Sequence, residues 1–176
     1  MNEVLIEGKR LRLRRADTAD LNYIMKLQSA PENQKFIVSF DKDYHREIII
    51  SDGKEKSDVI IEEIDTERAV GYFMLRELKS PCAEFTHVII EKKGVGYGRE
   101  ALNLLLKWTF KIKKYHRVWI DCKEYNDIAL KLYESIGFVR EGLLREIILT
   151  KGNYENLIVL GMLDREYFAR NFLSSH

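Results

Sequence analysis

The chain has 176 residues, of which 45% are hydrophobic and 32% charged, the composition of a globular protein with a single domain over residues 1–176. Its 29 Lys and Arg nearly balance its 28 Asp and Glu, leaving a net charge of +1, whereas a nucleic-acid-binding protein is usually distinctly basic. Two cysteines without metal-ligand spacing and no long apolar segment predict no metal site, no membrane span and a cytoplasmic location.

In the first third of the chain the pattern predicts one strand and two helices. Strict alternation over 10–14 indicates a half-buried strand. Asp17 is expected to cap the helix that follows. The apolar residues on the buried face of that helix recur at three- and four-residue spacing: Leu21, Ile24 and Leu27. A second helix is expected at 45–51, with a turn at Asp52-Gly53.

The middle of the chain predicts three strands and one long helix. Strands 59–64 and 70–75 form a hairpin around a charged turn. A further strand from about 83 to 90 leads into a glycine-rich loop, and an amphipathic helix follows over 101–112. This helix is expected to bury Ala101, Leu104, Leu105, Trp108 and Ile112.

The last third predicts a strand at 118–122, a helix at 126–135 and a hairpin of strands 144–150 and 157–163. Gly137 is placed to end the helix in a left-handed conformation. The result is an α/β (α+β) fold with a mixed sheet of about seven strands and about four helices.

The glycine-rich loop is the segment from Lys93 to Arg99. A strand, a glycine-rich turn and a helix in this order present several backbone N–H groups to one anion. Glycine permits positive φ and has no Cβ to obstruct a ligand. Three glycines at alternate positions (Gly94, Gly96 and Gly98) exceed what a helix cap needs, so we predict a loop that binds a diphosphate.

Two kinds of diphosphate ligand fit this loop. Gly96-x-Gly98-x-x-Ala101, with Asp121 at the end of the next strand, matches the dinucleotide fingerprint. However, residues 91–93 separate the glycines from the strand, and the chain ends in a hairpin rather than in further βαβ units. A dinucleotide-binding protein is therefore the weaker interpretation.

Two motifs resemble those of the GNAT superfamily of N-acetyltransferases. Lys93-x-x-Gly96-x-Gly98 resembles its phosphate-binding loop, and the segment Asn126-x-x-Ala129-x-x-Leu132-Tyr133-Glu134-x-x-Gly137-Phe138 resembles its second signature. The likeness extends from about residue 70 to 163 and is to the branch with RimJ/RimL-type protein N-terminal acetyltransferases and spermidine/diamine acetyltransferases. It implies a GNAT fold and acetyl transfer from acetyl-CoA to a primary amine by direct attack.

The resemblance also implies which residues form the site. The acetyl-CoA-binding set is Val88, Ile89, Ile90, Lys93, Gly94, Val95, Gly96, Tyr97, Gly98, Arg99, Asn126, Ala129 and Tyr133. Tyr133 is expected to act as general acid toward the sulfur, and Asn126 to contact the pantetheine arm. Glu84 is the expected base, acting through a water. Each of these residues could instead have a purely structural role. Asn126 could cap the helix, Tyr133 could pack in the core, and Glu84 could form an ion pair.

Two further residues could take part in the reaction. His87 is an alternative base, although a lone strand histidine is more often structural. Cys122 is an alternative nucleophile, but no activating His or cation accompanies it, so we expect a buried thiol.

The segment 31–51 is expected to form the acceptor side of the site, where Glu32, Asp41, Asp43 and Glu47 could attract a cation. The acceptor could be a protein N-terminus, a polyamine or an aminoglycoside-like amine. The alternative to an enzyme is a protein that binds acyl-CoA as a sensor without catalysing a reaction. We expect neither nucleic acid nor membrane as a partner, and a homodimer could form through the C-terminal hairpin.

Overall fold

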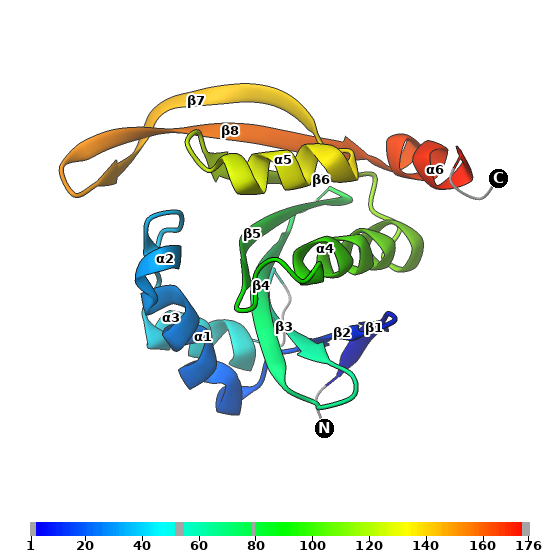
Figure 1. Ribbon diagram of the computed structural model, residues 1–176, viewed down its shortest axis with the longest axis horizontal. Helices are drawn as coiled ribbons and strands as arrows, with labels where there is room; N and C mark the ends of the chain where they lie inside the picture. The colour runs from blue at the N-terminus through cyan, green and yellow to red at the C-terminus, as the bar shows by residue number, and fades with distance from the viewer. Residues whose placement is uncertain (1–2, 52–54, 79, 174–176) are drawn as a thin grey trace.

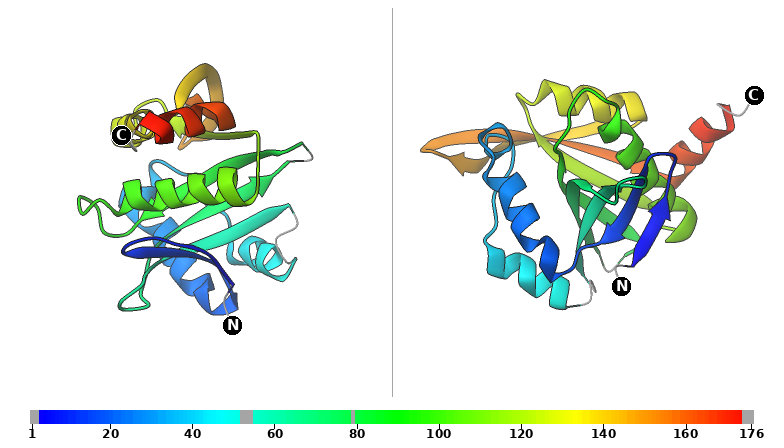
Figure 2. Two further views of the ribbon diagram at one scale, coloured as in Figure 1. Left: turned by 90° about the vertical axis from the view of Figure 1, so that its right-hand side faces the viewer. Right: turned by 60° about the horizontal axis from the view of Figure 1, so that its bottom comes forward.

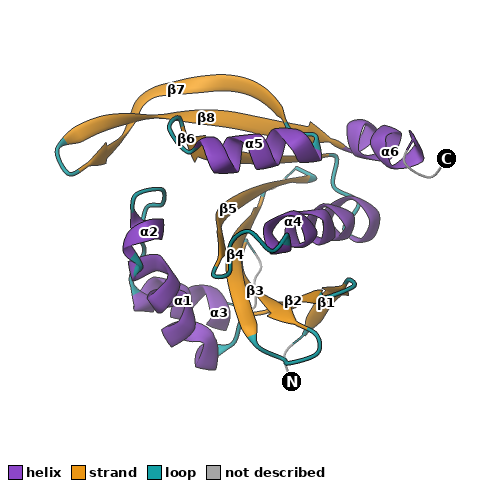
Figure 3. Cartoon of the chain, in the orientation of Figure 1, coloured by secondary structure: helices purple, strands orange, loops and turns teal. Residues whose placement is uncertain are grey.

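The computed structural model describes residues 3–51, 55–78 and 80–173, so the turn predicted at Asp52-Gly53 lies outside the described residues. Eight strands form one sheet in the order β1-β2-β3-β4-β5-β6-β8-β7 (Figures 1 and 3). Their bounds are β1 Val4–Glu7, β2 Leu11–Arg15, β3 Lys56–Glu63, β4 Ala69–Glu77, β5 Cys82–Ile90, β6 Arg117–Lys123, β7 Val139–Thr150 and β8 Asn153–Leu163. Neighbouring strands are antiparallel, except that β5 and β6 are parallel.

Six α-helices accompany the sheet: α1 Leu21–Ser29, α2 Pro31–Gln34, α3 Lys42–Ile50, α4 Tyr97–Lys107, α5 Asp127–Ile136 and α6 Asp164–Leu173. The predicted mixed sheet is confirmed, but β1, α2 and α6 were not predicted. β1 has only four residues, VLIE, without alternation, and α2 is a single turn that starts at a proline. No helix in the described part of the chain is both long and apolar enough to cross a membrane.

Helices lie on both faces of the sheet (Figure 2). α4 and α5 pack on the larger core, which contains Leu13, Phe73 and Leu105. On the other face, α1 covers a smaller cluster made of Ile24, Leu27, Ile60, Tyr72 and Ile89. Strands β3, β4 and β5 each contribute residues to both cores.

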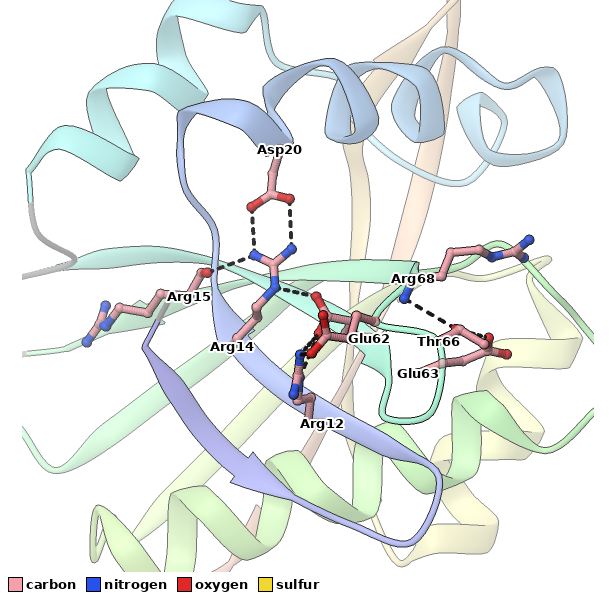
Figure 4. A network of polar contacts seen from close by, with 9 residues as sticks. Arg12, Arg14, Arg15, Asp20, Glu62, Glu63, Thr66 and Arg68 are labelled. Carbon is pink, nitrogen blue, oxygen red and sulfur yellow. Dashed lines mark hydrogen bonds and ion pairs between the residues drawn. The ribbon is translucent and has the colours of Figure 1, made fainter. Parts of the chain in front are cut away.

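A buried ionic network fixes the start of α1 against the sheet (Figure 4). Arg14 on β2 donates to both carboxylate oxygens of Asp20, at 2.8 and 2.9 Å, and to Glu62 on β3 at 2.6 Å. Asp17 accepts from the backbone N–H of Ala19, and Asp20 accepts from that of Asp17, a capping box on the 3-10 turn Thr18–Asp20 that leads into α1. Because all three charged groups of the network are buried, removing one leaves an uncompensated charge in the core.

The burial predicted for Ile112 is wrong. Ile112 is 55% exposed, because α4 continues into a π-helix over Trp108–Ile112. There the N–H of Lys113 bonds to the carbonyl of Trp108, five residues back. The wider turn rotates Ile112 away from the face predicted with α-helical spacing, and Phe110 is buried instead.

Candidate active site

Strands β5 and β6 separate in the middle of the sheet. Their pairing ends at Phe85 and Ile120, and β5 then bends at His87, whose φ of 49° accompanies a register shift against β4. Beyond Phe85, the edge of β5 that faces β6 has no strand partner among the described residues. The gap opens into a cavity of about 480 Å³ lined by residues of α2, α4, α5, β5 and β6.

This cavity contains every predicted acetyl-CoA-binding residue except Val95. Those that line it are Val88, Ile89, Ile90, Lys93, Gly94, Gly96, Tyr97, Gly98, Arg99, Asn126, Ala129 and Tyr133. They come from the glycine-rich loop, the free part of β5 and the first two turns of α5. Residues from sequence positions 88–99 and 126–133 therefore line one cavity.

The glycine-rich loop exposes the positive end of α4. Gly94 and Gly96 have φ of 81° and 85°, a conformation that is costly for other residues. The first three N–H groups of α4, from Tyr97 to Arg99, donate no hydrogen bond to any residue that the structure describes. Gly98 is needed for another reason: a Cβ there would lie 3.3 Å from Cδ2 of Leu132, so glycine lets α4 approach α5.

Arg10 contacts this loop, and the strand pattern over 10–14 was the only sequence signal at this residue. Its Nε donates to Glu100 in α4 at 2.7 Å, its Nη1 donates to the Val95 carbonyl at 3.1 Å, and its guanidinium lies 4.9 Å from the centre of the Tyr97 ring. The Val95 carbonyl therefore points to Arg10, and Val95 is not among the residues that line the cavity. The Tyr97 hydroxyl in turn donates to Glu63 at the end of β3. These contacts hold the loop from the side away from the ligand space.

Helix α5 positions Asn126 and Tyr133. Asn126 is the N-cap, and its side chain accepts from the N–H of Ala129 at 3.3 Å, so the capping role is present alongside its place in the cavity. The side chain of Tyr133 is 6% exposed, and its hydroxyl forms no hydrogen bond with the described residues. Burial, followed by the nearby Cys122 and Asp121, raises the pKa of the Tyr133 phenol. The hydroxyl is therefore a proton-bearing donor without a protein acceptor.

Glu84 lies next to the cavity rather than in its lining. The carboxylate is buried and forms an ion pair with Arg76 on β4. Burial raises the pKa of Glu84, which Arg76 opposes and Asp121 reinforces. Glu84 therefore forms the ion pair that was considered as the alternative to a role as base.

His87 lies in the cavity lining at the bend of β5. Its Nδ1 is buried and has no hydrogen-bond partner among the described residues. Burial lowers the pKa of His87 to about 4, with His45 contributing and a hydrogen bond to the backbone of Val38 opposing. The ring centre of Phe40 lies 5.2 Å away. His87 is therefore a neutral imidazole near neutral pH.

Residues 10–139 match the family model described as "Acetyltransferase (GNAT) domain". The chain belongs to this family. The predicted GNAT fold and N-acetyltransferase class are confirmed. The dinucleotide-binding alternative is wrong, because a doubly wound sheet needs consecutive parallel strands and this sheet has a single parallel pair.

Relatives of this GNAT chain include curated spermidine N(1)-acetyltransferases. The protein of Vibrio cholerae is 33% identical over 90 residues, which are 51% of this chain and 52% of that protein. The protein of Escherichia coli is 25% identical over 170 residues, 92% of this chain and 90% of that protein. The match to the Vibrio protein, like one at 35% identity to another curated N-acetyltransferase, spans about half of the relative's length.

The fold also matches a solved structure closely. The crystal structure of spermidine N-acetyltransferase from Vibrio cholerae in complex with CoA and spermine superposes with a TM-score of 0.80 at 26% identity. The match covers 92% of this chain and 99% of that one.

In this GNAT chain the acids of the segment 31–51, which were predicted to attract a cationic acceptor, lie outside the cavity. Glu32, Asp41, Asp43 and Glu47 are exposed and do not line the cavity. Asp41 caps α3 through the N–H of Tyr44, and Asp43 pairs with Arg46. The lining residues of this segment are instead Asn33, Phe36, Ile37 and Val38. Sequence spacing could not reveal this, because the short helix α2 decides which side chains turn inward.

Cys122 is a buried thiol, as predicted, although it lines the cavity. Burial, reinforced by Asp121, raises the pKa of Cys122 to about 12. A thiol with that pKa holds its proton at neutral pH and is a poor nucleophile. This environment favours direct transfer over an acyl-enzyme on Cys122.

Proposed function

We propose that this chain transfers the acetyl group of acetyl-CoA to a primary amine by direct attack, with a polyamine such as spermidine as the acceptor. The observation that carries the proposal is one cavity that joins the free N–H groups of α4, the unpaired edge of β5 and the hydroxyl of Tyr133. Each part matches one part of acetyl-CoA: the diphosphate, the pantetheine arm and the thioester.

The diphosphate would be held by the main chain at the start of α4. Each charge-assisted hydrogen bond from an N–H of Tyr97 to Arg99 contributes about 1.5–3 kcal/mol. The helix dipole adds about 0.3–1 kcal/mol. The individual N–H groups therefore dominate, and Lys93 and Arg99 add screened attraction.

The pantetheine arm would lie along β5. From Val88 to Ile90 one edge of the strand pairs with β4 while the other is free. An extended ligand with amide groups can hydrogen-bond to such an edge as an added strand would. This arrangement directs the thioester toward Tyr133 at the point where β5 and β6 separate.

The amine nitrogen would then attack the thioester carbon, form the C–N bond and expel the thiolate. Tyr133 can stabilise the thiolate by a hydrogen bond. Since its pKa is raised, hydrogen bonding is more important here than full proton transfer. The amine must first lose a proton. This requirement is slight for an α-amine with pKa about 7.8 but severe for a polyamine with lysine-like nitrogens near 10.4.

The polyamine is favoured as acceptor because relatives of this chain are named spermidine acetyltransferases and one was solved with spermine. A protein N-terminus, which the RimJ/RimL-type resemblance suggested, is the second candidate. A screen of spermidine, dipeptides and aminoglycosides, read by release of the CoA thiol, tests the assignment. Thiol release with spermidine above that with the other amines is expected. CoA binding without thiol release for any amine would instead support the non-catalytic sensor.

We also propose that β7 binds a second copy of the chain. This edge strand extends along β8 (Figure 1) and is exposed over most of its length. Its exposed apolar residues are Val139, Leu143, Leu144, Ile147 and Leu149. One structure of the Vibrio cholerae relative is described as dodecameric. Light scattering of the wild-type chain and of a Leu143→Glu, Leu149→Glu variant should show an oligomer and its dissociation, respectively.

A further inference from the structure

Asp121 occupies the first position of β6 beyond its pairing with β5. The pairing ends at Ile120, and Glu84 lies opposite Trp119. Side chains alternate along a strand, so Asp121 shares the face of Trp119 and Glu84. Ile120 and Cys122 point to the opposite face, toward the core under α5.

Among the described residues, Asp121 is the single carboxylate that lines the cavity. It is half-buried, and none of the hydrogen bonds or ion pairs found in this part of the structure involves its side chain. The carboxylates around it are engaged elsewhere: Glu84 with Arg76, and Glu155 with Lys123. Asp121 is thus a partly buried carboxylate without a direct ion pair among the described residues.

Strand register and the cavity lining place Asp121 relative to the other groups of the site. Asp121 lies two positions beyond Trp119, the residue opposite Glu84, and it lines the same cavity as Tyr133. Burial raises the pKa of Asp121 itself, and the Arg76 guanidinium opposes this shift. Tyr133 belongs to the core under α5, and Asp121 points to the opposite face. The two side chains therefore flank the gap between β5 and β6 from its two sides.

We propose that Asp121 binds the ammonium group of the acceptor and accepts its proton, which makes it a base of the transfer reaction; this inference rests on the proposed function. The proton of the ammonium passes to the Asp121 carboxylate, directly or through one water. The freed lone pair forms the C–N bond, and the C–S bond breaks with its electron pair on sulfur. A second proton from the nitrogen reaches the thiolate through Tyr133 or water, and Asp121 returns its proton to solvent.

An ammonium bound between Asp121 and the thioester gives one proton to the carboxylate. The freed lone pair first points at Asp121, and inversion or rotation of the neutral amine then turns it toward the thioester carbon. Glu84 cannot accept this proton without first breaking its pair with Arg76. Asp121 is itself partly buried, which strengthens the attraction between an ammonium and its carboxylate relative to bulk water.

The test compares Asp121→Asn with Glu84→Gln and with Asp127→Asn, an exposed carboxylate outside the cavity. For spermidine, Asp121→Asn should lower kcat/KM by about 100-fold or more, and Asp127→Asn should have no effect. With aminoacetonitrile, an amine already neutral at pH 7, the loss in Asp121→Asn should be at least tenfold smaller. CoA affinity by calorimetry should be unchanged, which shows that the variant is folded.

Two results would overturn the assignment to Asp121: wild-type kcat/KM in Asp121→Asn, or equal losses for spermidine and aminoacetonitrile. If the wild-type chain binds CoA but shows no turnover, the proposed function fails, and binding of spermidine to the CoA complex then decides the inference. At least tenfold weaker spermidine binding in Asp121→Asn supports it. Unchanged affinity, or no spermidine binding to the wild-type chain, refutes it.

Discussion

Replacing Gly96 by alanine tests the phosphate-binding loop most directly. Gly96 has φ of 85°, and an L-residue in the left-handed region costs about 1–2 kcal/mol. An added Cβ would lie 3.3 Å from Nη2 of Arg10, the flexible end of a side chain that can move aside. Backbone strain therefore sets the magnitude, and we expect Gly96→Ala to lower the free energy of unfolding by about 1–2 kcal/mol.

The same change should weaken CoA binding. If the loop relaxes its strain by turning one N–H group of α4 away from the phosphates, the complex loses about 1.5–3 kcal/mol. This loss corresponds to about 10- to 150-fold in Kd. Calorimetric titration with CoA measures the affinity, and guanidinium unfolding measures the stability.

Gly152 supplies a matched control. It lies in the turn between β7 and β8 with φ of 83°, and a Cβ there would meet nothing within 4 Å. Gly152→Ala should therefore have a similar cost in stability without any effect on CoA affinity. Equal CoA affinity in the two variants would refute the role of the Gly96 loop in holding the diphosphate.

Three other predictions concern the site. Tyr133→Phe should lower kcat by about 100-fold with CoA affinity unchanged; an unchanged rate would exclude the hydroxyl from the chemistry. Cys122→Ala should keep full turnover, and Cys122 should resist iodoacetamide at pH 7.5 because burial raises its pKa to about 12; rapid labelling of the folded chain would contradict this. Burial lowers the pKa of His87 from 6.5 to about 4. Between pH 6.5 and pH 4, His87 is therefore protonated in the unfolded chain but not in the folded chain. Stability should be complete above pH 6.5 and fall by up to about 1.4 kcal/mol per pH unit toward pH 4; the same slope in His87→Asn would assign the loss to other groups.

Much of the fold followed from local pattern. Local sequence patterns located seven of the eight strands and the helices α1, α3, α4 and α5. Errors arose where a residue's environment depends on distant parts of the chain. Ile112 fits a helical face by spacing, but the π-helix turns it outward. The acids of 31–51 suited a cationic acceptor, yet the way this segment packs leaves them in solvent.

The sequence by itself determined the conformation of the glycine-rich loop and the Asn126–Tyr133 helix, because main-chain conformation at glycines and side-chain direction within one helix are local properties. Only the tertiary structure decided which carboxylates are buried and which form ion pairs. Glu84 and Asp121 lie 37 positions apart in the sequence, and whether each has a counterion depends on Arg76 in a third segment. Burial and pairing of charges are set by the strands that meet around them, so the separation of β5 from β6 leaves Asp121 facing an open cavity while Glu84 is held by its neighbour.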